Sequence, residues 1–312
     1  MLLRRNIGPK YRFQPRAAVR AFARASMPST AVPRKKWGNS MLLSGELRDV
    51  RFSLGETDRR VVADRARAIG VDFSGLRFES FSAHGSVFEN CDFSEAAFDR
   101  LSLGATFAED GKWEREWDRV TWQQTVYRNC VFRRTRLASH TYFGNARFEG
   151  CLFDGARLRD IDMPQAEFVD CTFRGKLESI NFWGRLREYQ EALGRDCNAF
   201  SGNDLTDAKL TWVAFNHIDL TAQRLPGLPD YALLDRFGRR VDSALAIIQG
   251  WPDGKIKQEA QFKLKLRARW AAEYNEDVAL VSRAGPELGQ KLPPAIRNQI
   301  FRLLTDYSET QQ

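Results

Sequence analysis

The sequence predicts a mainly β solenoid that continues into a C-terminal α-helical region. A large apolar residue returns at every fifth position through the middle of the chain. A period of five matches neither a helix, at about 3.6 residues, nor a strand, at about two, and a fixed short period is the signature of stacked repeats. The pattern fades near residue 227, where apolar residues at helical spacing begin.

The repeat is clearest between Cys151 and Phe173, which read CLFDG ARLRD IDMPQ AEFVD CTF. The third residue of each block is large and apolar, and the first is mostly small. One block cannot bury this pair alone, so neighbouring blocks must stack. The central residues of this run are Phe148, Phe153, Leu158, Met163, Phe168 and Phe173, continuing to Leu177 and Phe182.

Three further runs keep the same period of five. The third run, which begins at Phe148, is slipped by one residue relative to the second. The central residues are Phe73, Phe78, Ala83, Phe88, Phe93, Phe98 and Leu103 in the first run, Trp122, Tyr127, Phe132, Leu137 and Tyr142 in the second, and Phe200, Leu205, Leu210, Phe215 and Leu220 in the fourth.

Several blocks resemble the pentapeptide-repeat family, whose consensus is A-(D/N)-L-x-x. The best matches are NDLTD at residues 203–207, IDLTA at 218–222 and CDFSE at 91–95. The resemblance covers about residues 71–227 and implies a right-handed quadrilateral β-helix in which four repeats form one square coil. It also implies that the central residue and the one two places before it point inward. Coils stacked at about 4.8 Å would make a rod about 30 to 35 Å long.

The chain divides into three parts. Residues 1–40 hold ten Lys or Arg and no Asp or Glu, whereas residues 41–312 hold 38 Lys or Arg and 40 Asp or Glu. The first part is a basic arm, either disordered or a targeting segment; an early start codon, with the true start at Met27 or Met41, is the other interpretation. Residues 41–227 form the repeat region and 228–312 the helical region. We expect a cytoplasmic protein, or a mitochondrial one if the arm is a transit peptide, and no membrane span.

Two insertions interrupt the repeat, near residues 104–116 and 183–197. Loops on a rigid scaffold are common sites of function, so both insertions are candidate partner-binding segments. Residues 185–193 predict a short helix that ends at Gly194. At the start of the repeat region, Leu47 and Phe52 indicate an opening coil, and residues 57–69 predict a helix before the solenoid. The candidate residues in the insertions are Asp110, Lys112, Trp113, Arg185, Arg187 and Tyr189.

The C-terminal region predicts three helices, at residues 233–248, 255–285 and 295–307. They either cap the solenoid, form a homodimer or bind a ligand. The middle helix carries a dense basic run, which is a candidate contact surface or simply a solvated helix face. Its candidate residues are Lys263, Lys265, Arg267 and Arg269.

The sequence holds no catalytic, metal-binding or cofactor-binding motif, so we expect neither enzymatic activity nor a cofactor. Cys91, Cys130, Cys151 and Cys171 fall at small inward positions and indicate core residues. Cys197 lies outside the phase and is the one candidate reactive thiol. Of the histidines, His140 is predicted inward, and His84 and His217 outward.

Three functional hypotheses remain. The first is a scaffold that presents a rigid face and two loops to a protein partner. The second, implied by the family resemblance, is a DNA mimic that binds a type II DNA topoisomerase, as quinolone-resistance and toxin-immunity proteins do. It ranks second because a DNA mimic needs a strongly negative surface, and the repeat region carries many outward arginines. The third is direct nucleic-acid binding through the basic arm and residues 255–269.

Overall fold

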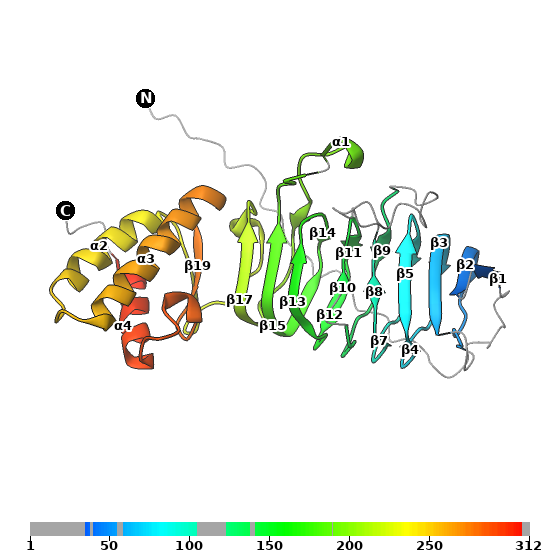
Figure 1. The fold of residues 1–312 in the computed structure, drawn as a ribbon, viewed down its shortest axis with the longest axis horizontal. Helices are drawn as coiled ribbons and strands as arrows, with labels where there is room; N and C mark the ends of the chain where they lie inside the picture. Colours follow the sequence, from blue (N-terminus) through cyan, green and yellow to red (C-terminus); the bar gives the residue numbers. More distant parts are fainter. Residues whose placement is uncertain are drawn as a thin grey trace, which may run out of the picture.

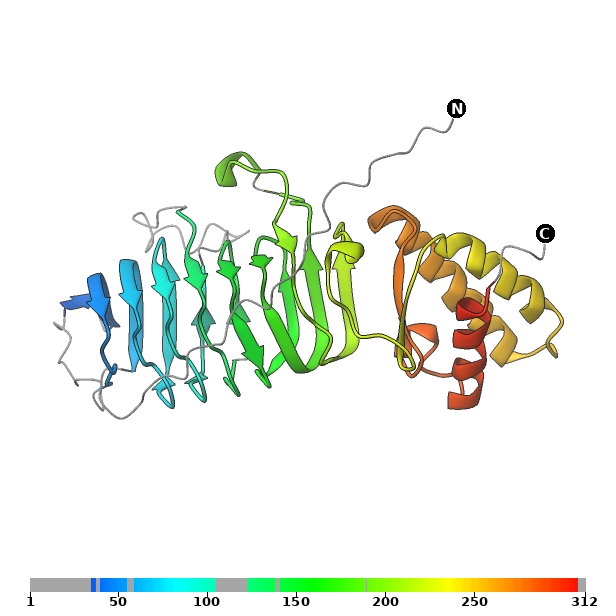
Figure 2. The same ribbon diagram turned by 180° about the vertical axis from the view of Figure 1, so that it is seen from behind.

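The computed structural model describes residues 35–37, 40–54, 59–104, 123–137, 141–188 and 190–307. The chain forms a long solenoid with a group of helices at one end (Figures 1 and 2). The solenoid elements are β1 Lys35–Trp37, β2 Ser40–Arg48, β3 Arg60–Ile69, β4 Arg77–Phe78, β5 Ser80–His84, β6 Val87–Glu89, β7 Ala97–Phe98, β8 Leu101–Ser102, β9 Val126–Arg128, β10 Thr141–Tyr142, β11 Arg147–Glu149, β12 Leu152–Asp154, β13 Leu158–Met163, β14 Glu167–Val169, β15 Thr172–Trp183, α1 Gln190–Leu193, β16 Phe200–Ser201, β17 Ala208–Asn216 and the 3-10 turn η1 Leu220–Ala222.

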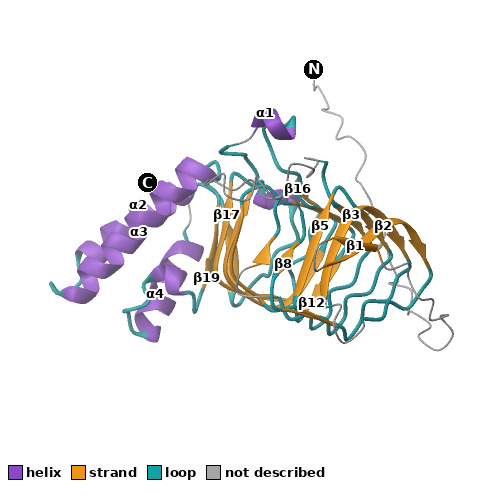
Figure 3. Ribbon diagram, turned by 45° about the vertical axis from the view of Figure 1, so that its right-hand side comes forward, coloured by secondary structure: helices purple, strands orange, loops and turns teal. Residues whose placement is uncertain are grey.

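Apart from β1, which pairs antiparallel with β2, the strands of the solenoid pair in parallel with strands one coil away. For example, β6, β9, β11 and β14 follow one another in a single ladder that aligns Phe88, Tyr127, Phe148 and Phe168. Long strands bend around a corner and join two faces: β3 pairs with β5 through residues 60–64 and with β6 through residues 67–69. The predicted fold class, a mainly β, right-handed quadrilateral β-helix with C-terminal helices, is confirmed (Figure 3).

Stacked aromatic rings fill the interior. Phe73, Phe93, Phe132, Phe153 and Phe173 form one column, with ring centroids 4.8 to 5.1 Å apart and planes within 6° of parallel. This spacing follows the separation of about 4.8 Å between neighbouring strands. The five-residue phase therefore places one ring directly over the next. Each buried Phe contributes about 1.5 to 3 kcal/mol of transfer free energy.

One corner of the coil has left-handed backbone at each level. Asn90, Asn129, Gly150, Asp170 and Gly202 stack there with φ between 52° and 66°, a region that Gly, Asn and Asp tolerate best. A Cβ atom on Gly150 would lie 2.6 Å from Asn129 Oδ1, and one on Gly202 would lie 2.1 Å from Asp170 Oδ1. Gly is therefore required where the Asn or Asp of the preceding coil folds over the corner.

The cysteine prediction is confirmed. Cys91, Cys130, Cys151 and Cys171 are buried free thiols in one column, whereas Cys197 is exposed. Each buried thiol donates to a carbonyl of the preceding coil, as Cys151 Sγ does to Tyr127 O at 3.3 Å. Burial raises the pKa of the Cys130 and Cys171 thiols. In the next coil Asn203 takes this place, with Nδ2 donating to Phe168 O at 3.0 Å.

Three details of the predicted repeat are wrong. Tyr142 is 59% exposed and Phe143 is 1% exposed, so Phe143 and not Tyr142 is the inward residue of this block. The one-residue slip therefore lies between Leu137 and Phe143, one block earlier than predicted. Residues 60–69 are strand β3 instead of helix, because parallel pairing with β2 and β5 buries both of its apolar faces. His84 is buried instead of outward. Burial lowers the pKa of His84 to about 4, against a smaller opposing effect of Asp64. His140 lies outside the described residues.

The C-terminal region is a helical unit with a two-stranded sheet. Its elements are β18 Tyr231–Leu234, α2 Phe237–Gln249, α3 Lys255–Tyr274, β19 Ala279–Ser282, the 3-10 turn η2 Pro286–Leu288 and α4 Pro294–Thr305. The strands β18 and β19 pair antiparallel where the sequence predicted helix, and α3 ends at Tyr274 instead of continuing to residue 285. The helices and strands share one apolar core that includes Phe237, Val241, Leu264, Val281 and Ile300.

This unit covers the last coil of the solenoid. Leu210 N donates to Tyr231 Oη at 2.9 Å, and His217 N donates to Tyr274 O at 2.8 Å. These bonds use backbone groups at the edge of β17, which would otherwise be open to pairing with another chain. No described helix is long and apolar enough to cross a membrane.

Candidate partner-binding site

Both insertions leave the solenoid at the same corner. The first begins after Leu103 and the second after Phe182, which lie at equivalent positions at the end of one face of the coil. The chain returns at Tyr127 and Phe200, which belong to one ladder on the next face. Figures 1 and 2 show the second insertion, with α1, projecting from this edge. The solenoid therefore brings together two segments that lie about 80 residues apart in the sequence.

A buried carboxylate joins the bases of the two insertions. Glu167, 4% exposed, lies at this corner on β14. Its Oε2 accepts from Gln124 Nε2 at 2.7 Å at the base of the first insertion, and is 2.5 Å from Arg195 Nη1 in the second. Its Oε1 accepts from Ala199 N at 2.8 Å, and Arg147 Nη1 is 3.2 Å from Oε2. We call Gln124, Arg147, Glu167, Arg195 and Ala199 the loop corner.

The charge of Glu167 is stabilised in place. Burial by itself raises the pKa of this carboxyl group, but the Ala199 N–H, the Gln124 amide and the two guanidinium groups outweigh burial and hold its pKa below the ordinary value. Burial lowers the pKa of Arg195, which makes its contact with the carboxylate more important. The loop corner is therefore an ionic and hydrogen-bonded anchor and not an acid–base pair poised to exchange a proton.

The second insertion is fixed at its base and exposed at its tip. Asn198 Nδ2 donates to the carbonyls of Pro164 and Trp183 at 2.9 and 2.8 Å. Arg185 and Cys197 form an antiparallel bridge across the base. The predicted helix of residues 185–193 is shorter than expected, covering only Gln190–Leu193, and it ends at Gly194 as predicted.

The structure places the candidate residues of the insertions only in part. Asp110, Lys112, Trp113 and Tyr189 lie outside the described residues. Arg185 is exposed at the base of the second insertion. Arg187 lies over the ring of Trp183, with 5.2 Å from Cζ to the ring centroid. Sequence reasoning missed Gln124, Glu167 and Arg195, because their partnership depends on coil stacking.

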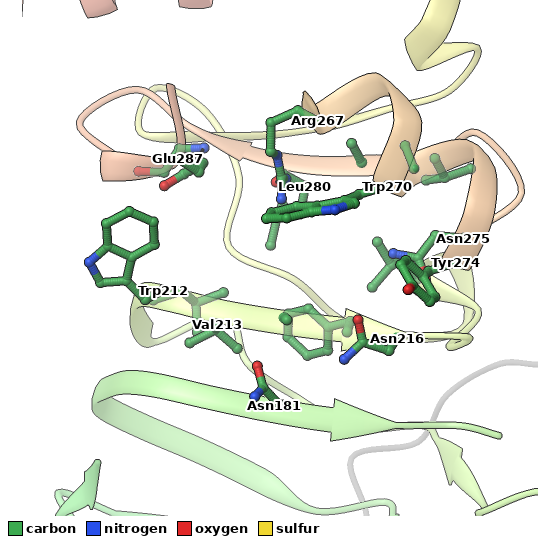
Figure 4. Close-up of a pocket in the computed structure, with 18 of the residues that line it drawn as sticks. Asn181, Trp212, Val213, Asn216, Arg267, Trp270, Tyr274, Asn275, Leu280 and Glu287 are labelled. Carbon is green, nitrogen blue, oxygen red and sulfur yellow. Dashed lines mark hydrogen bonds between the residues drawn. The ribbon is translucent and has the colours of Figure 1, made fainter. Parts of the chain in front are cut away.

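A second concave site lies where the last coil meets the C-terminal unit (Figure 4). We call it the C-terminal groove; its volume is about 720 Å³. Its floor includes Trp212, Val213 and Asn216 of β17 and Asn181 of β15, and its roof is formed by α3 and β19. The roof includes Lys263, Arg267, Trp270, Tyr274 and Leu280.

The basic run on α3 therefore has two faces. Lys263 and Arg267 line the C-terminal groove, whereas Lys265 and Arg269 do not. Arg269 instead lies 3.9 Å from Glu273 on the exposed side of the helix. Trp212 and Trp270 were missed by sequence reasoning. The available signal was Trp212 at an outward position of a repeat, where a polar residue is expected.

Arginines and carboxylates alternate on the outer faces of the solenoid. Arg128 pairs with Glu149 at 2.8 Å, and Arg224 with Asp204 at 2.9 Å, each pair joining two coils. Further pairs of this kind are Arg133 with Asp154, Arg134 with Glu95, and Arg174 with Asp207. The described surface is thus charge-balanced along the stack. Within the described ranges, no group of three His, Cys, Asp or Glu side chains is arranged to hold a metal ion.

Parallel coils around a core of inward Phe and Leu define a quadrilateral β-helix. Residues 141–175 match the family model described as Pentapeptide repeats (8 copies). The five-residue register of that segment continues through the coils on both sides, so the chain carries a pentapeptide-repeat β-helix. No curated protein matches the chain.

Three solved structures show weaker similarity. Two are of QnrB1, described as a plasmid-mediated fluoroquinolone resistance protein: one is 14% identical and covers 60% of this chain and 90% of that chain with a TM-score of 0.23, and the other is 16% identical and covers 69% and 89% with a TM-score of 0.21. The third is HetL from Nostoc sp. strain PCC 7120, described as a pentapeptide repeat protein involved in heterocyst differentiation regulation, at 14% identity, 60% and 81% coverage and a TM-score of 0.20. Similarity at this level carries no argument about function.

Proposed function

We propose that this protein is a non-enzymatic scaffold that binds a protein partner through the edge carrying both insertions. The observation that supports the proposal is the loop corner: one buried carboxylate, Glu167, contacts the bases of both insertions and holds them at one edge of a rigid solenoid. Segments held in place before binding lose less conformational entropy when a partner binds. Among the described residues, the other faces of the solenoid carry paired charges and no comparable projection (Figure 1).

Affinity capture tests this proposal. The tagged wild-type protein is compared with a variant in which residues 185–197 are replaced by a short Gly-Ser linker, and with Arg185→Glu/Arg187→Glu, which changes charge without shortening the loop. Arg133→Ala and Arg224→Ala, on other faces of the solenoid, are the matched controls. We expect a partner captured by the wild type and both controls to be lost from the two loop variants. Equal capture by all five proteins, each shown to be folded by circular dichroism, would contradict the proposal.

A type II topoisomerase is the alternative partner. The alternating pairs on the outer faces disfavour it, because a protein that replaces duplex DNA must offer continuous negative charge to a site made for phosphates. A gyrase supercoiling assay decides the matter. If the protein at micromolar concentration neither inhibits gyrase nor protects it from a quinolone, this alternative is excluded. If either effect is observed, the topoisomerase replaces our choice of partner.

A further inference from the structure

The C-terminal groove carries a second binding function, independent of the loop corner. We infer that it binds a short extended peptide segment of a protein partner, and that the segment bears a carboxylate next to an apolar ring such as proline or an aromatic side chain. The inference goes beyond the proposed function, because the groove is built from β17, α3 and β19 and shares none of the loop-corner residues.

The shape of the groove fits an extended chain. Trp212 and Asn216 mark two ends of the floor along β17, and four residues of strand span about 13 Å. Trp270 lies over this floor from α3, as Figure 4 shows. Trp212 and Trp270 are each 45% exposed although both line the groove. Two half-exposed indole rings facing one channel are suited to hold an apolar ring between them.

Two buried polar atoms of the groove have no hydrogen-bond partner: Arg267 Nε, a donor, and Asn275 Oδ1, an acceptor. Buried polar groups in native proteins are nearly always satisfied. Both atoms are closed to solvent in the free protein, so a shift of the Arg267 and Asn275 side chains would be needed to bring them to a backbone carbonyl and N–H of the occupant. Arg267 already donates from Nη2 to Leu280 O at 3.1 Å, which fixes its guanidinium plane at the groove.

The charge at the groove favours an acidic occupant. Lys263 and Arg267 are its lining cations, and Glu287 is its one lining carboxylate. Glu287 Oε1 already accepts from Ser282 N at 2.9 Å. Burial lowers the pKa of Arg267, and the nearby carboxylate of Glu287 opposes this shift. A carboxylate from a ligand would meet Arg267 with a charge-assisted hydrogen bond. The arm of residues 1–40, with ten basic and no acidic residues, is the wrong sign to occupy this groove.

The test is a selection of peptides on the intact protein. A random 12-residue phage-display library is selected on the wild type, and the enriched peptides are synthesised and titrated by calorimetry. We expect a consensus that combines Asp or Glu with Pro, Phe, Tyr or Trp. Arg267→Gln and Trp270→Ala should each weaken binding about tenfold or more, as loss of a charge-assisted bond or an aromatic anchor does. Trp270 is half-exposed, so its variant keeps the inference testable if Arg267→Gln fails to fold.

Arg269→Gln and Phe262→Ala are the matched controls, because both residues are exposed on α3 and neither lines the groove. We expect them to change affinity less than twofold, about the scatter of such titrations. The variant in which a Gly-Ser linker replaces residues 185–197 should bind the peptides normally. Failure of the groove proposal can therefore be distinguished from failure of the proposed function. A consensus without acidic residues, peptides that bind both groove variants as tightly as the wild type, or equal binding of free glutamate would each overturn the inference.

Discussion

Replacing Glu167 by Gln should loosen the base of the second insertion and cost stability. The amide keeps an acceptor for Ala199 N, but its NH₂ group faces Gln124 Nε2, Arg147 Nη1 and Arg195 Nη1 where Oε2 stood. Removing hydrogen bonds to a charged group costs about 1.5 to 3 kcal/mol each. Arg147 Nε keeps its contact with Glu149 Oε1 at 2.6 Å, and Arg195 Nη2 still donates to the carbonyl of Gln165 at 2.6 Å. These remaining contacts partly offset the losses. We therefore expect a total loss of about 2 to 3 kcal/mol.

Two measurements check this value. Guanidinium unfolding followed by far-ultraviolet circular dichroism gives the overall loss, and hydrogen exchange at the Ala199 amide reports the local one. The matched control is Glu95→Gln, because the side chains of Glu95 and its partner Arg134 are both exposed, at 54% and 68%. An exposed pair contributes at most about 1 kcal/mol. If Glu167→Gln costs less than about 0.5 kcal/mol and leaves Ala199 exchange unchanged, the carboxylate is not the anchor we describe.

The same variant has a defined pH dependence. The pKa of Glu167 is lowered in the folded protein, so the ionised form stabilises the fold. That contribution is fully present above the unfolded pKa of about 4.3 and is lost as the pH falls through the folded pKa. The stability difference between wild type and Glu167→Gln should be constant from pH 8 to pH 6 and shrink below about pH 4.3. A difference that grows on acidification would refute this account.

Three further outcomes are expected. Burial lowers the pKa of His84 to about 4, so folding favours its neutral form. Protonation of His84 in the unfolded chain should therefore lower the unfolding free energy of the wild type by about 2 kcal/mol between pH 8 and pH 5. In urea titrations, His84→Gln should remove most of this pH dependence, whereas His217→Gln, at an exposed residue, should not. Gly202→Ala should destabilise more than Gly75→Ala in thermal unfolding, because both have positive φ but only the Cβ at residue 202 meets a neighbour, Asp170 Oδ1 at 2.1 Å; equal losses would argue that strain alone matters. Ellman's reagent should modify one thiol, Cys197, in the native protein and all five after denaturation, whereas rapid reaction of a second native thiol would contradict a closed core.

The period of five was sufficient to predict the inward residues of most coils. Phe153, Phe173 and Cys151 could be assigned without a structure, because identical spacing forces identical faces to stack. The pattern failed where two neighbouring residues were both apolar: Tyr142 and Phe143 fit the spacing equally well, and only packing against the adjacent coils decides which one turns inward. The prediction of a helix at residues 60–69 was wrong for a related reason, since their apolar residues fit a helix as well as a strand buried on both sides.

By itself, the sequence determined the class of fold and the burial of four thiols, because both follow from local spacing repeated along the chain. The tertiary structure alone decided what those features do together. Gln124, Glu167 and Arg195 meet only because successive coils stack the same corner, and they are separated by 43 residues in one case. The groove likewise needs α3 to fold back over β17, which places Arg267 and Trp270 opposite Trp212. Contacts between distant segments depend on how the chain closes, and no local period encodes that closure.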